Sequence, residues 1–265
     1  MAIKKEKKEA KKKPAEKEIV KDVKEISEFP KMNFFNKIKK MFFKPATFFG
    51  SVEKENRYTH IINTLLIIYV VYFILFTLSD LIIGGVGASG KDYFIKVMTG
   101  FVSIVVAAII SPFIWAGIVH VGVLVFKGKE KYLQTFKPVT YALAIGIIYS
   151  IIGVIIAFVL QLIIPVDSSM LQSLDPNVID PQAMINAYQA YYSQPVPIVL
   201  LVISVISLIH QFIFMFNGLA KFQKLSKKRA AWAIILPIIV VIAFAILISI
   251  VLSFSQLMAY VNSTT

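Results

Sequence analysis

Five long apolar segments alternate with polar connections along the chain. A bilayer core about 30 Å thick is crossed by about 20 helical residues, at about 1.5 Å per residue. Each segment reaches that length; together they cover about residues 60–83, 97–126, 138–164, 196–220 and 230–256. A lipid-exposed segment of this kind satisfies its backbone hydrogen bonds only as a helix, because hydrocarbon offers no water. The pattern predicts an all-α protein, a polytopic membrane bundle of five transmembrane helices.

Lys and Arg lie almost entirely in every other connection. Of the 28 basic residues, 17 precede residue 59, four lie within 126–137 and five within 221–229, whereas the other connections hold only Lys91 and Lys96. Basic residues in short loops remain on the cytoplasmic side of a membrane. We therefore expect an integral, multi-pass membrane protein, in the cell membrane if the source is prokaryotic. Its N-terminus should be cytoplasmic and its C-terminus outside.

Composition divides the chain further. Residues 1–31 are rich in Lys, Glu and Ala with little to bury, and are expected to form a disordered, polybasic arm. Residues 32–58 follow as an amphipathic interfacial segment, residues 59–258 as the five-span domain, and residues 259–265 as an outer tail.

The net charge is +13, and residues 1–58 contribute +8 of it, with 17 basic and nine acidic side chains. Anionic membrane lipids are therefore expected partners. Nucleic acid is not, because glutamates interrupt the lysines and no nucleic-acid-binding module is present.

The segment before the first span has the pattern of a short amphipathic helix. Phe34, Ile38, Met41 and Phe42 recur at helical spacing among lysines, and Pro45 should end the helix. Such a helix suits the membrane interface, with its rings among the acyl chains and its ammonium groups among the head groups. The alternative is that it docks on the cytoplasmic ends of the spans. The candidate lipid-binding side chains are Phe34, Phe35, Lys39 and Lys40.

The residues that could carry chemistry are few. Cysteine is absent, and Asp80 is the only acid within an expected span. His120 lies about two turns inside its span and His210 lies about 16 Å from Lys221 along its helix, so the two form a candidate intramembrane polar site. The alternative for His210 is a neutral imidazole that is hydrogen-bonded to Gln211, Ser207 or another helix. No catalytic, cofactor-binding or metal-ligating residue is predicted.

Three stretches go beyond hydropathy. They are Pro45-Ala46-Thr47-Phe48-Phe49, the run from His120 through Phe126-Lys127-Gly128-Lys129-Glu130-Lys131-Tyr132 to Ala142, and Gly218-Leu219 through Lys224 to Ala231. In this order and in a five-span frame, they resemble the Ypt-interacting-protein (Yip) domain family in its prokaryotic form, over about residues 40–258. The resemblance implies five spans and a cytoplasmic N-terminus. Eukaryotic relatives are linked to vesicle trafficking and Rab-type GTPases, but the chain has no clear counterpart of their Asp-Leu-Tyr-Gly-Pro motif.

The leading interpretation is a non-enzymatic membrane adaptor or organiser that works at the cytoplasmic face, in a trafficking-like or membrane-homeostasis role. It would bind anionic lipid through its tail and a cytoplasmic or membrane protein through two basic loops, and it could form a homo-oligomer. The candidate residues in these loops are Lys129, Lys131, Tyr132, Thr135, Phe136, Lys227, Lys228 and Arg229. The alternative is a small permease or channel with a pathway near Pro112, His120 and His210. An intramembrane enzyme is a third, weaker interpretation.

Overall fold

The computed structural model describes residues 34–53, 55–84, 90–163, 182, 185–186, 189–190 and 194–264. Within these residues, five helices are long and apolar enough to cross a membrane, which confirms the predicted all-α five-span fold. The five are α4 (Tyr58–Gly84), α5 (Gly90–Val125), α6 (Tyr132–Ile163), α9 (Pro195–Phe222) and α10 (Lys227–Thr264). The charged arm 1–31 and most of the glycine-rich turn before Gly90 lie outside the described residues.

Two short helices precede the first span: the first is the amphipathic helix that the pattern predicted, and the second was not predicted. They are α2 (Phe34–Phe43) and α3 (Pro45–Ser51), and Pro45 begins α3 after ending α2. The chain divides into two compact units, residues 1–39 and residues 40–265. In the described part of the first unit, the ring of Phe35 is 75% exposed and Lys39 is also exposed. In the second unit, Met41 and both phenylalanines of α3 are buried.

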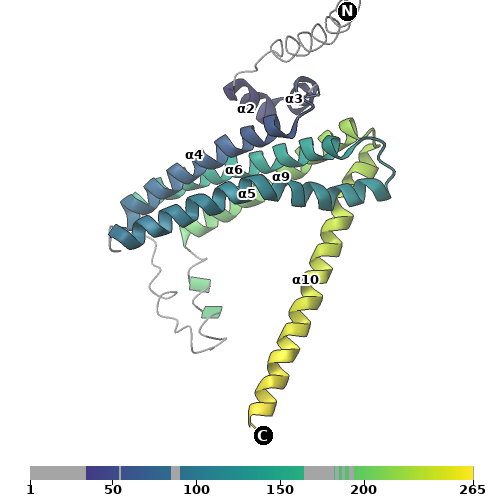
Figure 1. Ribbon diagram of the computed structural model, residues 1–265. Helices are drawn as coiled ribbons and strands as arrows, with labels where there is room; N and C mark the ends of the chain where they lie inside the picture. Colours follow the sequence, from purple (N-terminus) through teal and green to yellow (C-terminus); the bar gives the residue numbers. More distant parts are fainter. Residues whose placement is uncertain are drawn as a thin grey trace, which may run out of the picture. The chain divides into compact units, whose positions relative to one another are not determined.

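Helix α6 is the centre of the second unit. It packs against α9, α4 and α5, while α10 packs against α5 and α9, and α3 lies against α9. Figure 1 shows α4, α5, α6 and α9 side by side, and successive spans run in opposite directions. The bundle therefore has one end at which α5 and α9 finish and α6 and α10 begin. We call this the basic end, because its connections hold nine of the Lys and Arg residues within residues 126–137 and 221–229.

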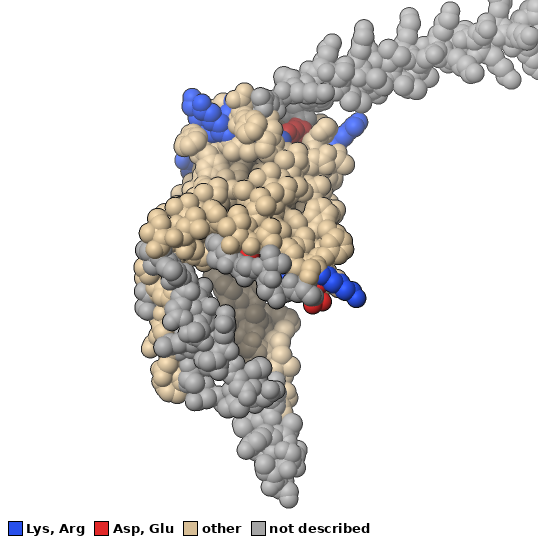
Figure 2. Space-filling model, turned by 90° about the vertical axis from the view of Figure 1, so that its left-hand side faces the viewer, with Lys and Arg blue, Asp and Glu red and all other residues tan. Residues whose placement is uncertain are grey.

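The sides of the bundle carry the apolar surface that a bilayer requires. From Ile239 to Phe254, every large apolar side chain of α10 is exposed, and the exposed faces of the other spans are rich in Ile, Val, Leu and Phe. Figure 2 shows charged side chains near the two ends of the tan surface, with a tan band between them. In water such a surface would cost about 25 cal/mol for each Å² of apolar area, so this is a lipid-facing surface.

Two helices begin earlier than hydropathy predicted. Helix α5 begins at Gly90, before the expected residue 97, and α6 begins at Tyr132, before the expected residue 138. Polar residues in the first turns hid both starts, since a hydropathy window marks the apolar core of a helix and not its ends. Pro138 consequently lies inside α6, where its ring fits against Gly218 of α9.

Close packing of α5 on α10 depends on Gly122. A Cβ added there would collide with the backbone carbonyl of Ala233 and come within 2.7 Å of the Pro237 ring. At Gly117, five residues earlier in the same helix, an added Cβ would meet nothing within 4 Å.

We predict that Gly122→Ala lowers the free energy of unfolding by about 1–3 kcal/mol, the usual cost of overpacking, because backbone cannot yield as a side-chain tip can. Gly117→Ala is the control, and it should be neutral or stabilising because alanine favours a helix by up to about 1 kcal/mol over glycine. Thermal unfolding of both variants in detergent micelles measures the difference. Equal stability of the two variants would contradict the close contact of α5 with α10.

Candidate functional site

The two loops of the basic end share one backbone feature, a lysine in the left-handed conformation shortly after a helix ends. Lys127 and Lys224 adopt positive φ angles of 60° and 53°, immediately after α5 and α9. A residue in this left-handed region stops a helix and turns the chain back. After α5, the Gly128 N–H donates to the Val123 carbonyl at 2.8 Å and the Lys127 N–H donates to the Leu124 carbonyl at 3.0 Å, which is a Schellman motif. The loops are therefore tight turns with defined geometry.

Gln223, at the end of α9, joins the two loops. Its side chain is 0% exposed. Its amide oxygen accepts from the Glu130 N–H at 3.1 Å, and its amide nitrogen donates to the Lys131 carbonyl at 3.3 Å and to the Thr135 hydroxyl at 2.9 Å. Gly128 leaves room for this approach, because an added Cβ would lie 3.0 Å from the Gln223 amide oxygen. One buried amide thus holds the loop 126–131 against the loop 223–226.

His120 belongs to the same network. Its Nδ1 lies 2.8 Å from the Thr135 hydroxyl, and its ring meets the Tyr132 ring edge-on at 5.2 Å. The Tyr132 hydroxyl donates to the Phe113 carbonyl at 2.9 Å, which ties the start of α6 to the middle of α5. His120, Thr135 and Gln223 therefore form one chain of hydrogen bonds behind the loop.

An aromatic core lies beneath the loops. Phe48 and Phe49 of α3 pack on Phe214 with ring centroids 5.5 and 4.5 Å apart, and Phe48 also meets Tyr141 edge-on at 4.8 Å. The buried ammonium of Lys137 donates to the Glu53 carbonyl at 2.9 Å and lies 5.3 Å from the centroid of the Phe222 ring. Helix α3 thus fills the space between α6 and α9 at this end of the bundle.

Exposed cations surround this packed base. They are Lys127, Lys129, Lys131, Lys221, Lys224, Lys227, Lys228 and Arg229. Lys224 pairs with Glu130 and Lys221 with Glu53, and among the described residues no ion pair involves Lys129 or Lys131. The hydrogen bond and the charge of Glu130 raise the pKa of Lys224. The stabilisation linked to this raised pKa is present at neutral pH and is lost as the pH rises through it.

The candidate residues from the sequence fall into two groups. Lys129, Lys131, Lys227, Lys228 and Arg229 are exposed, as a binding surface requires. Thr135 and Phe136 are 0% exposed, so the expectation that the loop presents them to a partner is wrong. Both lie in the first turns of α6, where Thr135 bonds Gln223 and Phe136 packs 4.8 Å from Phe113 and 4.9 Å from Tyr58. Tyr132 is half-buried over the same cluster.

His210 lies apart from His120. Its Nδ1 is 3.2 Å from the Tyr149 hydroxyl of α6, and its ring meets Phe42 edge-on at 5.1 Å. This is the hydrogen bond to another helix that the second interpretation of His210 expected. Among the described residues, no three His, Asp or Glu side chains are grouped so that they could hold a metal ion.

Sequence reasoning missed the buried polar residues Gln223, Lys137 and Tyr141. Each stands next to basic or apolar neighbours that dominate the pattern, so nothing local marked them as buried. A weak signal was available: Gln223 follows the apolar α9 directly and precedes a residue that turns the chain.

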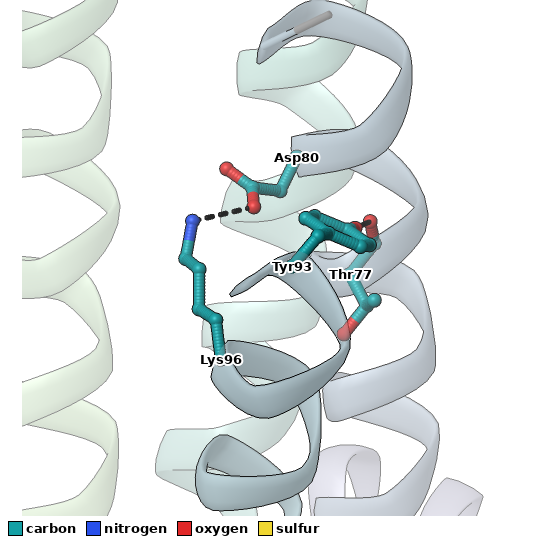
Figure 3. Close-up of polar contacts among 4 residues, drawn as sticks. All are labelled: Thr77, Asp80, Tyr93 and Lys96. Atoms are coloured by element: carbon teal, nitrogen blue, oxygen red, sulfur yellow. Dashed lines mark hydrogen bonds and ion pairs between the residues drawn. The ribbon is translucent and has the colours of Figure 1, made fainter. Parts of the chain in front are cut away.

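A polar clamp joins α4 and α5 at the other end of the bundle. The Lys96 ammonium lies 2.8 Å from Asp80 Oδ2, and the Tyr93 hydroxyl donates to the Thr77 carbonyl at 3.3 Å. Figure 3 shows both α5 side chains reaching across to α4. Asp80, the acid that the sequence placed within a span, is therefore paired with Lys96 of the connection that follows.

The model of the Yip1 domain family matches residues 39–250 of the 265-residue chain. The chain belongs to the Yip1 domain family. No curated protein and no solved structure gives a significant match. The protein is thus an integral, multi-pass membrane protein of the Yip family, and the match includes α3, both basic loops and the part of α10 that packs on α5.

The three Yip-like stretches meet in space. Phe48 of the first packs on Tyr141 of the second. Phe49 of the first lies beside Gly218 of the third, where an added Cβ would come within 2.8 Å of the Phe49 ring. Residues from all three stretches therefore meet in the packed base of the basic end.

We predict that Gln223→Leu lowers the free energy of unfolding by about 1–3 kcal/mol, because it leaves buried donors and acceptors without partners. It should also speed hydrogen exchange at the Glu130 amide, which bonds the Gln223 side chain. Hydrogen-exchange mass spectrometry of the purified protein measures this change. Gln134→Leu serves as the control, because the amide oxygen of Gln134 is buried without a hydrogen-bond partner in the described structure. Unchanged protection of Glu130 would refute the role of Gln223.

Proposed function

We propose that this Yip-family protein is a non-enzymatic adaptor or organiser that works at the cytoplasmic face. The basic end is the working surface, and it faces the cytoplasm because basic connections remain on that side. The polybasic tail binds anionic lipid, with Phe34, Phe35, Lys39 and Lys40 next to the membrane. The basic loops bind a cytoplasmic or membrane protein.

The observation that carries this proposal is the fixed position of the exposed cations. Lys129 and Lys131 flank Glu130, whose backbone N–H is bonded to the buried Gln223 amide, and Lys227 begins the helix that follows the second loop. A fluid lipid surface accommodates cations on flexible segments just as well. A preorganised pattern of charge instead favours a folded partner with a complementary acidic surface, because less ordering is required on binding.

The alternative, a permease or channel, requires a continuous pathway near Pro112, His120 and His210. The environments of the two histidines speak against a shared pathway. His120 bonds Thr135 in the loop network, whereas His210 bonds Tyr149 beside the Phe42 ring. Pro112 is buried within α5.

We predict that a photoreactive amino acid at Lys129 crosslinks one discrete protein in native membranes, whereas the same probe at Lys91, an exposed residue at the other end, does not. Reversing the charges of Lys131, Lys227 and Lys228 should reduce the Lys129 crosslink by about tenfold or more. Charge reversal removes attraction to an acidic partner and adds repulsion.

The control reverses Lys91 alone, which changes the net charge while leaving the basic loops and the Lys96–Asp80 pair intact. The crosslink should survive in that variant. Crosslinking from Lys129 to lipid alone would contradict the adaptor function.

Orientation has its own test, because the native chain contains no cysteine. We predict that Lys91→Cys reacts with a membrane-impermeant maleimide in intact cells, whereas Lys129→Cys reacts only after permeabilisation. Both side chains are exposed, so accessibility differs only by the side of the membrane. The reverse labelling pattern would place the basic end outside and overturn the proposal.

A further inference from the structure

A groove of about 810 Å³ lies between α6 and α9 and reaches the end of α4. This volume is within the range of about 300–1,000 Å³ that is typical of small-ligand sites. Its walls are formed by the small face of α6 and the facing side of α9. On α6 this face holds Gly146, Ser150, Gly153, Ala157 and Gln161.

The groove is closed at one end and open at the other. Toward the basic end its last lining residues are Leu143 of α6 and Gln211 of α9, and Tyr141 and Ile145 beside Leu143 are buried. Toward the other end it reaches Asp80 and Gln161 near the ends of α4 and α6. The groove therefore suits a bound ligand better than a passage through the membrane.

Several polar side chains in the walls of the groove form hydrogen bonds within their own helices. The Ser150 hydroxyl donates to the Gly146 carbonyl at 3.2 Å, and the Ser204 hydroxyl donates to the Leu200 carbonyl at 2.8 Å. The Gln211 amide donates to the Ser207 hydroxyl at 2.9 Å. Because the Ser150 and Ser204 hydroxyls donate within their own helices, an acyl chain lies beside them without leaving these two donors unsatisfied.

The mouth of the groove is charged. Asp80 lines it, and the ammonium of Lys96 lies 2.8 Å from the Asp80 carboxylate. Both side chains are accessible, with 34% of Asp80 and 66% of Lys96 exposed. An anion and a cation are thus presented together near the end of α4 (Figure 3).

We propose that the groove binds a zwitterionic aminophospholipid from the leaflet at this end of the bundle. The lipid amine is held by the Asp80 carboxylate and the lipid phosphate by the Lys96 ammonium. One acyl chain follows the groove past Ala157 and Gly153 toward Ser150. An anionic phospholipid fits less well, because its phosphate meets Asp80 without an amine to offset the repulsion.

The test uses the full chain in nanodiscs whose bulk lipid is phosphatidylglycerol. Trace phosphatidylethanolamine or trace phosphatidylglycerol carries the same diazirine-bearing acyl chain. We expect the phosphatidylethanolamine probe to label α6 and α9 peptides of the groove roughly fivefold more than the other probe, the factor that one exposed ion pair supports.

Two kinds of variant locate the binding site. Asp80→Asn and Lys96→Met should reduce the phosphatidylethanolamine labelling to the phosphatidylglycerol level, whereas Lys91→Met at the start of the same helix should not. Ala157→Phe should block labelling by filling the groove, whereas Ala107→Phe, on the exposed face of α5, should not.

Equal labelling by the two probes would identify bulk lipid only and overturn the proposal. Labelling that persists in Asp80→Asn and Lys96→Met would also overturn it, even if Ala157→Phe failed to fold. The outcome is independent of the adaptor function, because the basic loops are unchanged in every variant.

Discussion

The buried amide of Gln223 is the interaction on which the basic end depends. It bonds the backbone of one loop on both sides of Glu130, and it bonds Thr135 at the start of α6. A buried amide with all of these partners is stabilising, whereas the same amide with one partner missing costs about 1–3 kcal/mol. The arrangement is therefore cooperative: the two loops, the end of α9 and the start of α6 hold one another in place. The positions of the exposed lysines follow from it.

The two ends of the bundle are packed by opposite means. At the basic end, rings from α3 enter between α6 and α9, and Gly218 makes room for Pro138 and Phe49. Toward the other end, α6 presents glycine, serine and alanine to α9. Among the described residues, no helix like α3 inserts aromatic rings between them there. The same pair of helices thus closes at one end and leaves a groove at the other. The difference follows from side-chain volume along α6, and it separates the proposed partner surface from the proposed lipid site.

Hydropathy predicted the five helices well because every backbone N–H and C=O group in lipid must be hydrogen-bonded within the protein. It placed the helix starts poorly, because Tyr132 to Lys137 contain polar side chains that are nevertheless helical and largely buried. Thr135 and Phe136 were assigned to a surface for this reason. Gln223 was missed because a single amide beside several lysines has the pattern of a solvated loop. The groove was missed because its small residues come from two helices separated by more than 30 residues, and only packing brings them together.

The resemblance to the Yip family has a physical basis in this packing. Phe49, Pro138 and Gly218 come from stretches about 90 and 80 residues apart, and they occupy one volume in which a single added Cβ would clash with both neighbours. Residues of this kind are constrained by shape, so they identify the fold and do not specify a partner. The exposed cations Lys129 and Lys131, and the charged pair at the groove mouth, carry no such constraint from packing. In both proposals, specificity for a protein or a lipid is therefore assigned to these exposed groups, and the Yip core supplies the frame that holds them.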